Sequence, residues 1–225
     1  MTETMEHIGI RLLCLLIGYV FGLLQTAYIL GKSKGIDIRE HGSGNAGTTN
    51  TLRVMGKKAG LIVFLGDVFK TFFAILTVYF VFRNRYPEMV YLLKLYAGFG
   101  AILGHNFPFY LHFKGGKGIA SMGGMILAFY WPFIPVGAVA FFATFAITNY
   151  VSLGSLIMSG CFFLQMVVFG IFGVGIFANI PMEIRVEMMI MALIISGLAF
   201  FRHHANIGRL LRGEERKTYL FKKNK

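Results

Sequence analysis

The sequence IGIRLLCLLIGYVFGLLQTAYIL occupies residues 8–30 and consists almost entirely of apolar side chains. At a rise of about 1.5 Å per residue, a helix of this length crosses the roughly 30 Å hydrocarbon core of a bilayer. The acidic segment TETMEH precedes it in place of a basic region, and no A-x-A-like cleavage site follows it. We therefore predict a transmembrane helix and not a cleaved signal peptide.

The composition extends this conclusion to the whole chain. Of the 225 residues, 56% are hydrophobic and 14% are charged, and the mean hydropathy is +0.66. An average soluble domain has about 25% charged residues and could not bury so much apolar surface in one core. Lipid must therefore be the solvent for much of the chain. Cys14 and Cys161 lie inside apolar runs, so we predict neither a disulfide framework nor a metal site.

The lengths of the apolar segments predict an all-α polytopic membrane protein with about seven transmembrane helices, in a single domain over residues 1–225. Pro132 and Pro135 separate the fourth segment from the fifth, so these two are alternatively one broken helix, which gives six crossings. The predicted helices cover residues 8–30, 59–82, 88–106, 118–132, 134–149, 153–178 and 187–202.

The basic residues favour seven crossings. Lysine and arginine gather after the first, third and last predicted helices, and only seven crossings bring these segments to one side, opposite the acidic N-terminal segment. Because cytoplasmic loops carry the excess of Lys and Arg, we expect the N-terminus outside and the C-terminus in the cytoplasm. These cations are Lys32, Lys34, Arg39, Arg53, Lys57, Lys58, Lys114, Lys117, Arg202, Arg209, Arg212, Arg216, Lys217, Lys222, Lys223 and Lys225.

The first polar motif is HGSGNAGTTNTLR, residues 41–53. Its residues 42–47 match G-x-G-x-x-G, but a dinucleotide fingerprint follows a strand, whereas here a membrane helix precedes the motif. Glycines still let backbone N–H groups approach an anion, and nearby hydroxyl groups and Arg53 add donors and charge. We therefore predict an anion-binding loop, with a flexible solvated loop as the alternative.

The second motif is GHNFPFYLHFKGGKGIAS, residues 104–121. It is not a Walker A sequence, because Gly118 stands where Ser or Thr is needed and Leu111 where Gly is needed. Lys117 nevertheless lies in a Gly-Gly-Lys-Gly turn that leads into a helix, and a lysine beside a helix N-terminus binds anions. Lys114 is sufficiently explained as a cytoplasmic anchor of the topology.

The third motif is RHHANIGRLLRGEERK, residues 202–217. Most of its arginines are typical of a helix lying on anionic lipid. His203 and Asn206 share one helical face and are candidates for a site. A further polar interruption, TNYVSLGS, occupies residues 148–155, and Asp67 and Lys70 lie three residues apart in the second predicted helix. Because charges inside a membrane are costly, we expect these two to pair and face a polar cavity, as structural support.

Several catalytic patterns are missing from the sequence. No Asp lies between a nucleophile and a histidine in hydrolase order, and no histidine is followed five residues later by Asp, as in many acyltransferases. Both thiols lie in apolar runs, which disfavours a cysteine nucleophile.

Taken together, SGNAGTTNTLR, GHNFPFYLHFKGGKG, VSLGS and RHHANIGRLL resemble the motifs of the PlsY family, the bacterial acyl-phosphate:glycerol-3-phosphate acyltransferases. The resemblance extends from about residue 8 to residue 215. Two positions depart from it: Asn149 stands where relatives often have a basic residue, and Ser121 replaces a common Thr.

The resemblance implies a seven-span enzyme of the bacterial cytoplasmic (inner) membrane, with its N-terminus outside and its active site facing the cytoplasm. Such an enzyme transfers a fatty acyl group from acyl phosphate to the 1-hydroxyl of glycerol 3-phosphate, giving lysophosphatidic acid and phosphate. We expect no cofactor, no metal and no nucleic acid, with membrane lipids as partners and a monomeric chain. The choice of acyl phosphate over acyl-CoA as donor rests on the resemblance alone.

The resemblance also implies the site residues. The expected catalytic residues are Ser43, Arg53, Lys117, His203 and Asn206. The expected substrate-binding residues are Gly42, Gly44, Asn45, Gly47, Thr48, Thr49, Asn50, His105, Gly115, Gly116, Gly118 and Ser152. The general base stays open between a neutral histidine and a phosphate oxygen of a substrate.

The principal alternative is a transporter or flippase of a phosphorylated organic anion or lipid. Such proteins usually contain repeated halves with polar breaks near the membrane midplane, whereas this chain has polar loops on one face and no evident repeat. A membrane anchor that binds anionic lipid through its basic tail would explain residues 209–225 but not SGNAGTTN.

Overall fold

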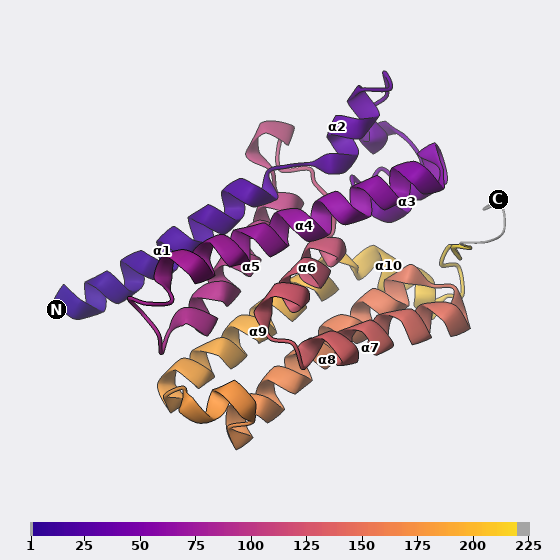
Figure 1. Cartoon of the computed structure of the whole chain (residues 1–225). Coiled ribbons are helices and arrows are strands. Elements are labelled where there is room, and N and C mark those ends of the chain that lie inside the picture. The colour runs from indigo at the N-terminus through magenta and orange to yellow at the C-terminus, as the bar shows by residue number, and fades with distance from the viewer. Residues whose placement is uncertain (1, 220–225) are drawn as a thin grey trace.

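The structure, a computed structural model, describes residues 2–219 (Figure 1). Met1 and residues 220–225, which include Lys222, Lys223 and Lys225 of the basic tail, lie outside the described residues. The regular structure within residues 2–219 is helical. The α-helices are α1 (Thr2–Gly22), α2 (Thr26–Lys32), α3 (Thr48–Met55), α4 (Lys57–Phe82), α5 (Val90–Asn106), α6 (Ile119–Phe129), α7 (Phe133–Thr148), α8 (Val151–Phe172), α9 (Met182–Arg202) and α10 (His204–Leu211). Short 3-10 turns are η1 (Ile38–Glu40), η2 (Phe109–Leu111) and η3 (Gly175–Asn179).

Several of these helices suit a membrane. Four segments are long and apolar enough to cross one: His7–Lys32, Lys57–Phe82, Val151–Phe172 and Met182–Arg202, while α6 and α7 are shorter apolar helices. Large hydrophobic side chains such as Leu61, Phe142 and Phe172 are exposed on the outer faces, which is the arrangement expected where lipid is the solvent. The prediction of an all-α membrane protein is thus confirmed for the described residues, whereas the count of seven crossings stays a prediction.

The first predicted helix is interrupted. Instead of one helix over residues 8–30, α1 ends at Gly22 and α2 begins at Thr26. The buried amide of Gln25 lies in the break and donates to the carbonyl oxygens of Gly22, Gly104 and His105, at 3.2, 3.0 and 3.2 Å. The side chain of Gln25 therefore provides hydrogen bonds to backbone carbonyls of α5. The helix is interrupted at this residue.

The fourth and fifth predicted segments are two helices. α6 ends at Phe129, three residues before the predicted end, and α7 begins at Phe133. Between them Tyr130, Trp131 and Pro132 form a turn, in which the carbonyl of Tyr130 accepts from Phe133 N at 3.0 Å. Residues 118–149 therefore contain two helices with a turn between them, and their count as two crossings stays a prediction.

The last two predicted helices have different bounds. α8 ends at Phe172, before the predicted residue 178, because Gly173 and Gly175 take positive φ angles of 62°. α9 begins at Met182, five residues before the predicted start, although this first part is charged. Glu187 is accommodated there by a bidentate pair with Arg11 at 2.7 Å.

Glycine faces pack α1 closely against α5. A Cβ added at Gly18 would overlap the backbone of Ala97, and one added at Gly100 would overlap the carbonyl of Leu15. The absence of side chains at Gly18 and Gly100 therefore allows the close approach of α1 and α5.

Lys94 anchors the far end of α6. Its ammonium donates to the carbonyl of Phe129, the last residue of that helix, at 2.5 Å. The rings of Tyr91 and Tyr79 lie 4.8 and 5.2 Å from the same nitrogen, a cation–π cage. One end of α6 is thereby fixed, while its other end carries the Lys117 turn.

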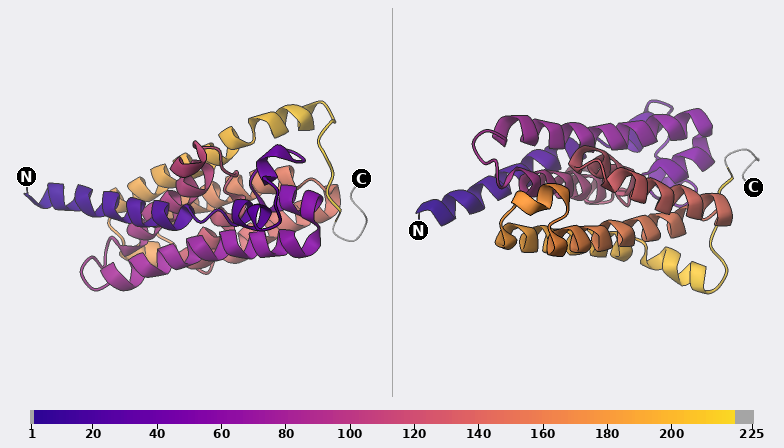
Figure 2. Two further views of the ribbon diagram at one scale, coloured as in Figure 1. Left: turned by 90° about the horizontal axis from the view of Figure 1, so that it is seen from above. Right: turned by 60° about the horizontal axis from the view of Figure 1, so that its bottom comes forward.

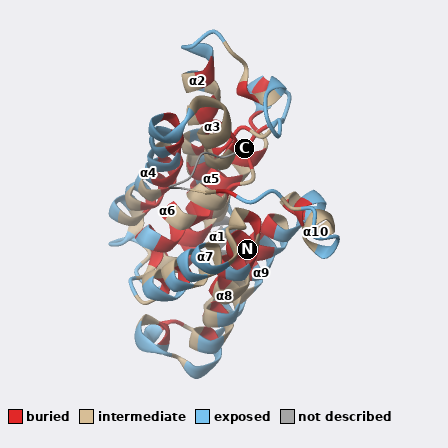
Figure 3. Cartoon of the chain, turned by 90° about the vertical axis from the view of Figure 1, so that its right-hand side faces the viewer, coloured by how far each residue is buried: buried red, intermediate tan, exposed pale blue. Residues whose placement is uncertain are grey.

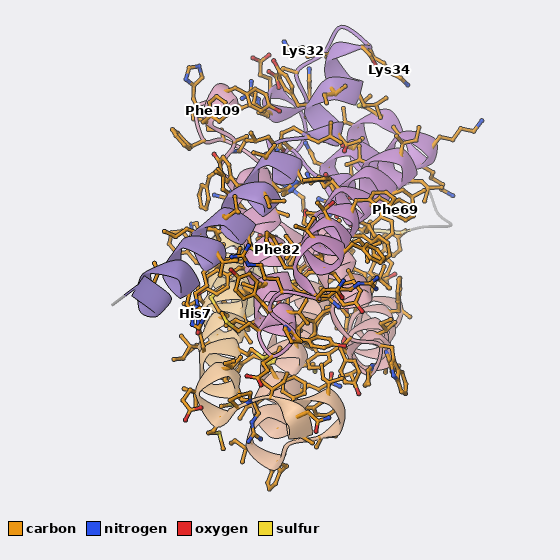
Figure 4. All side chains as sticks on the ribbon, turned by 60° about the vertical axis from the view of Figure 1, so that its left-hand side comes forward. His7, Lys32, Lys34, Phe69, Phe82 and Phe109 are labelled. Atoms are coloured by element: carbon orange, nitrogen blue, oxygen red, sulfur yellow. The ribbon has the colours of Figure 1, made fainter. Side chains whose placement is uncertain are left out.

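The polar segments gather at one end of the bundle. The N-terminus lies at the opposite end from α2, α3, α10 and the last described residues (Figures 1 and 2). Lys32 and Lys34 likewise lie far from His7 (Figure 4). Seen from this end, the residues between the helices are buried and the outer faces are exposed (Figure 3). All three sequence motifs therefore meet at one end.

Candidate active site

A cavity of about 990 Å³ opens at this end of the bundle. α3, α4, α6, α7 and α8 contribute to its walls, together with the loops before α3 and α6 and the junction of α9 with α10. Of the residues predicted for the site, all line this cavity except Gly116. Three segments far apart in the sequence are thus brought together around one space.

Asn50 shapes the first loop. It is 1% exposed, and its side-chain oxygen accepts from the backbone N–H of Ser43 at 2.8 Å. Its amide nitrogen donates to the carbonyls of Ile38 and His41, at 3.0 and 2.9 Å. The Asn50 side chain thus holds the loop that contains Ser43 through hydrogen bonds to the backbone of that loop and of Ile38.

The glycines of the first loop are required by its conformation. Gly42 and Gly44 have φ angles of 64° and 70°, which side chains rarely adopt. The loop ends at the N-terminus of α3, where Thr48 has a buried hydroxyl with no hydrogen-bond partner among the described residues. A donor and a helix N-terminus therefore face the cavity together.

The second loop is packed tightly against the end of α5. Gly115 N donates to Asn106 O at 3.2 Å and Gly116 N donates to His105 O at 3.1 Å. A Cβ at either glycine would overlap His105, its carbonyl oxygen in one case and its imidazole Nε2 in the other. The two glycines therefore allow close approach, and their amides are occupied within the protein.

Lys117 follows these glycines, and Gly118 at φ 81° turns the chain into α6. The Lys117 ammonium donates to the side-chain oxygen of Asn206, so the second and third motifs are in direct contact. Arg202, one of the arginines of the third motif, donates to the carbonyl of Gly116 at 2.8 Å and holds the loop from the side of α9.

His203 lies at the junction of α9 and α10. Its Nδ1 lies 2.8 Å from the carbonyl of Ala199, and because a carbonyl only accepts, Nδ1 carries the proton. Burial, assisted by the charge of Lys117, lowers the pKa of His203 to about 4. The ring is therefore neutral at cellular pH, and Nε2 is left as an acceptor.

A buried charged cluster lies below the loops. Lys70 Nζ lies 2.7 Å from Asp67 Oδ1 and 2.8 Å from His105 Nδ1. The predicted pairing of Asp67 with Lys70 is therefore confirmed, and Asp67 and His105 line the cavity.

Comparison with known proteins assigns this arrangement to a family. A family model described as "Glycerol-3-phosphate acyltransferase" matches residues 12–213. The chain belongs to this family. A glycerol-3-phosphate acyltransferase of Clostridioides difficile is 41% identical over 207 residues, which is 89% of this chain and 92% of the relative. Glycerol-3-phosphate acyltransferase 2 of Bacillus cereus is 35% identical over 95% of this chain and 98% of its own length.

Solved structures agree with the assignment. The crystal structure of PlsY, an integral membrane glycerol 3-phosphate acyltransferase, in its glycerol 3-phosphate form, superposes with a TM-score of 0.78 and is 31% identical. The match covers 94% of this chain and 99% of that one. Its lysophosphatidic acid form superposes with a TM-score of 0.75, also at 31% identity, over 93% of this chain and 95% of that one. The resemblance inferred from the motifs is confirmed, as is the acyltransferase class, and the transporter alternative is not favoured.

One carboxylate of this family member was absent from our sequence-based site. Glu215 accepts from Ser152 at 2.9 Å, from Asn206 at 2.6 Å and from Arg209 at 2.7 Å. Burial opposes its ionisation, but these three hydrogen bonds lower its pKa overall. Glu215 thus joins VSLGS to the third motif, and the signal in the sequence was a lone acidic pair within the basic segment RGEERK.

Residues 213–218, which we call the C-terminal strap, contribute Glu215 and Arg216 to the lining of the cavity. Thr218 N donates to Asn149 O at 2.9 Å, and Arg53 donates to the hydroxyl of Thr218 at 2.7 Å and to the carbonyl of Arg216 at 3.2 Å. Burial and the nearby charge of Arg216 lower the pKa of Arg53. Arg53 therefore connects α3 to the strap.

The cavity is strongly cationic at its polar end. Burial, together with the charges of Arg209, Arg202 and Arg53, lowers the pKa of Lys117 to about 8, although Glu215 acts in the opposite direction. Such a cluster is unfavourable until an anion enters, so the site suits a multiply charged oxyanion. Among the described residues, no group of three or more His, Cys, Asp or Glu side chains could hold a metal ion.

Glu215→Gln should loosen the strap. We expect the free energy of unfolding at pH 7 to fall by about 1–3 kcal/mol, because charge-assisted hydrogen bonds to buried groups are lost. The folded-state pKa of Glu215 lies below its ordinary value of 4.5, so its stabilisation is present above pH 4.5 and lost as the pH falls through the folded value. Thermal unfolding in detergent should accordingly depend less on acid pH in the variant. The exposed Glu214→Gln is the control, and equal effects would contradict the assignment.

Proposed function

We propose that this enzyme transfers a fatty acyl group from acyl phosphate to the 1-hydroxyl of glycerol 3-phosphate, giving lysophosphatidic acid and phosphate. The observation that carries the proposal is a single cavity whose polar end is lined by Arg53, Lys117, His203 and Asn206 and whose remainder is apolar. Related proteins described as glycerol-3-phosphate acyltransferases, one of them in glycerol 3-phosphate and lysophosphatidic acid forms, support the acceptor and the product.

In this proposal Lys117 and Arg53 neutralise substrate phosphates. Ser43 and the unpartnered Thr48 hydroxyl add neutral donors at the first loop, beside the N-terminus of α3. Asn206 and His203 orient glycerol 3-phosphate. Because acyl phosphate is already an activated mixed anhydride, no covalent enzyme intermediate is needed, and catalysis consists of positioning and stabilisation of charge.

The acceptor hydroxyl oxygen attacks the acyl carbon, and the bond from that carbon to the phosphate oxygen breaks. His203 Nε2 accepts a hydrogen bond from the hydroxyl group and directs its lone pair. With a pKa of about 4, His203 is a weak base. We therefore assign the proton to a phosphate oxygen of a substrate, with inorganic phosphate as the leaving group that Lys117 stabilises.

The acyl chain lies in the apolar part of the cavity. Side chains from α4, α6, α7 and α8 line this part, among them Phe69, Gly123, Ile126, Phe141 and Met158. It extends along α6 below Lys117, so a chain whose phosphate is bound at the loops continues between the helices. The acyl chain would enter this part of the cavity from the bilayer, between the helices that line it.

Gly123→Leu should shift the enzyme toward shorter acyl chains. A Cβ added at Gly123 meets no atom within 4 Å, and Gly123 lines the cavity, so the leucine would occupy acyl space without strain. We expect kcat/KM for long-chain acyl phosphate to fall about tenfold, by analogy with the loss of one or two methylene contacts, and that for short chains to be retained. Gly160→Leu is the matched control, because Gly160 is equally open but lies outside the cavity. Equal losses at all chain lengths would contradict this position for the chain.

Lys117 should produce an alkaline limit in kcat/KM. Its pKa of about 8 means that the free enzyme loses the ammonium charge above pH 8, so kcat/KM for glycerol 3-phosphate should fall there. A bound phosphate favours the charged form, so the corresponding limit in kcat should lie at higher pH. In Lys117→Arg, whose guanidinium does not titrate in this range, any residual activity should lack this limit. An unchanged profile would assign the limit to another group.

We further propose that the protein is a monomeric single domain that crosses the bacterial cytoplasmic membrane seven times, with α1, α4, α5, α6, α7, α8 and α9 as crossings. The gathering of Lys and Arg at the end that carries the cavity supports a cytoplasmic site and an external N-terminus. Cysteine substitutions at Thr4 and at Lys34, labelled in intact cells with an impermeant reagent, test this: only the first should react. Native mass spectrometry tests the monomer.

One assay tests the function. Purified protein in detergent receives glycerol 3-phosphate with acyl phosphate or with acyl-CoA, and the release of phosphate and formation of lysophosphatidic acid are measured. We expect turnover with acyl phosphate. Turnover with acyl-CoA alone would correct the donor, and no turnover with either would overturn the proposal.

A further inference from the structure

The buried charges of α4 are arranged with more order than a simple ion pair requires. The side chains of Lys70 and Asp67 are 1% and 2% exposed, within a membrane helix where charges are costly. The ammonium of Lys70 has three N–H donors and three acceptors at hydrogen-bond distance: Asp67 Oδ1 at 2.7 Å, Leu24 O at 2.8 Å and His105 Nδ1 at 2.8 Å. Each N–H group of Lys70 thus has an acceptor, and one of the three acceptors is a histidine nitrogen.

This geometry determines where the proton of His105 lies. An ammonium has no lone pair, so His105 Nδ1 can contact Lys70 only as an acceptor. A proton on Nδ1 would point at a cation 2.8 Å away, and its possible acceptor, Asp67 Oδ1, is farther off at 3.5 Å. His105 is therefore neutral with its proton on Nε2.

The protonated nitrogen lies where the two predicted anion loops meet. A Cβ built on Gly116 would overlap His105 Nε2, and the same point is 2.9 Å from the carbonyl oxygen of Ala46 in the first loop. His105 also lines the cavity. The absence of a side chain at Gly116 thus leaves the Nε2–H group beside both loops.

We propose, building on the proposed function, that Lys70 and Asp67 are positioning residues that hold His105 as a neutral Nε2–H donor to a substrate phosphate. Lys70 fixes the tautomer, and Asp67 keeps Lys70 charged and in place. The charge of Lys70 therefore does not contact the substrate. It stays paired with Asp67 and determines which nitrogen of His105 donates a hydrogen bond to the substrate.

The test uses the two amide substitutions that imitate the two ring nitrogens. His105→Gln places an N–H donor near the position of Nε2, whereas His105→Asn reaches only the position of Nδ1. We expect His105→Asn to raise KM for glycerol 3-phosphate or acyl phosphate about 10- to 100-fold, the range for a hydrogen bond to a charged group. His105→Gln should lose less activity than His105→Asn, because it keeps a donor near the position of Nε2.

The positioning role is tested in a double-mutant cycle. Asp67→Asn with Lys70→Met removes both charges together, so that no unpaired charge is buried. In the wild-type background we expect KM to rise about tenfold; in the His105→Gln background we expect no further change, because an amide has no tautomer to set. An equal rise in both backgrounds would overturn the proposal and leave the pair a purely structural role. Thermal unfolding identifies variants that fail to fold.

A second readout does not depend on turnover. In protein labelled with ¹⁵N-histidine, with His105→Gln used to assign the signal, the ring shifts of His105 should report a proton on Nε2, and this should change in the charge-neutral double variant. A proton on Nδ1 in the wild type would contradict the proposal even if the enzyme is active. Failure of the proposed function would instead appear as wild-type protein without turnover.

Discussion

Lys117→Ala is expected to lower kcat/KM for glycerol 3-phosphate by about 10²–10³-fold, equivalent to roughly 2.7–4 kcal/mol of transition-state stabilisation, by comparison with oxyanion-hole donors. Lys117 is the cation between the second loop and Asn206, and it lines the polar end of the cavity. Phosphate release in detergent, measured at saturating and limiting concentrations of each substrate, separates the effect on kcat from that on KM.

The matched control for this variant is Lys34→Ala. Lys34 is exposed and lies at the same end of the molecule, in the turn after α2, but outside the cavity. It should retain normal turnover because it does not line the cavity. Near-normal activity of Lys117→Ala would refute the role of Lys117 as a phosphate ligand.

Arg53→Ala should cause a loss of about 10²-fold in kcat/KM on the same reasoning. This variant also removes the hydrogen bonds from Arg53 to Thr218 and Arg216, so two explanations compete. One is the loss of a cation for a substrate phosphate, and the other is release of the C-terminal strap.

Thr218→Val separates them, because it removes the hydroxyl acceptor and leaves the guanidinium in place. We expect Thr218→Val to lower stability slightly and activity less than tenfold, since a single neutral partner is lost. If Thr218→Val were as inactive as Arg53→Ala, the strap and not the charge would explain the loss. Steady-state kinetics and thermal unfolding of both variants decide between the two.

The motifs were predictable because the chemistry of anion binding is local. Glycines at Gly42 and Gly44 and the cation of Lys117 each leave a sign in a short stretch of sequence, and the structure places these stretches around one cavity. Glu215 was missed for the opposite reason. A carboxylate in a basic tail resembles a solvated charge, and only the fold brings Ser152 to it across 63 residues.

Helix bounds were least predictable where polar residues are satisfied by distant partners. Hydropathy cannot anticipate that Gln25 will bond to carbonyls of α5 and interrupt the first helix. Nor can it show that the charge of Glu187, the predicted first residue of the last helix, will be paired with Arg11, 176 residues away. In a membrane helix the face toward lipid is apolar like the face toward the protein. Hydrophobic periodicity therefore does not indicate where the first predicted helix is interrupted or where α9 begins.

The C-terminal strap also affects when the site is completed during synthesis of the chain. Arg53 belongs to the first quarter of the chain, yet its partner Thr218 follows 165 residues later. During synthesis the first two motifs enter the membrane early, but the wall that completes their cavity leaves the ribosome only after the last helix. A nascent chain therefore holds an unfinished site, and the lining of the cavity is complete only after the last helix and the strap have been made.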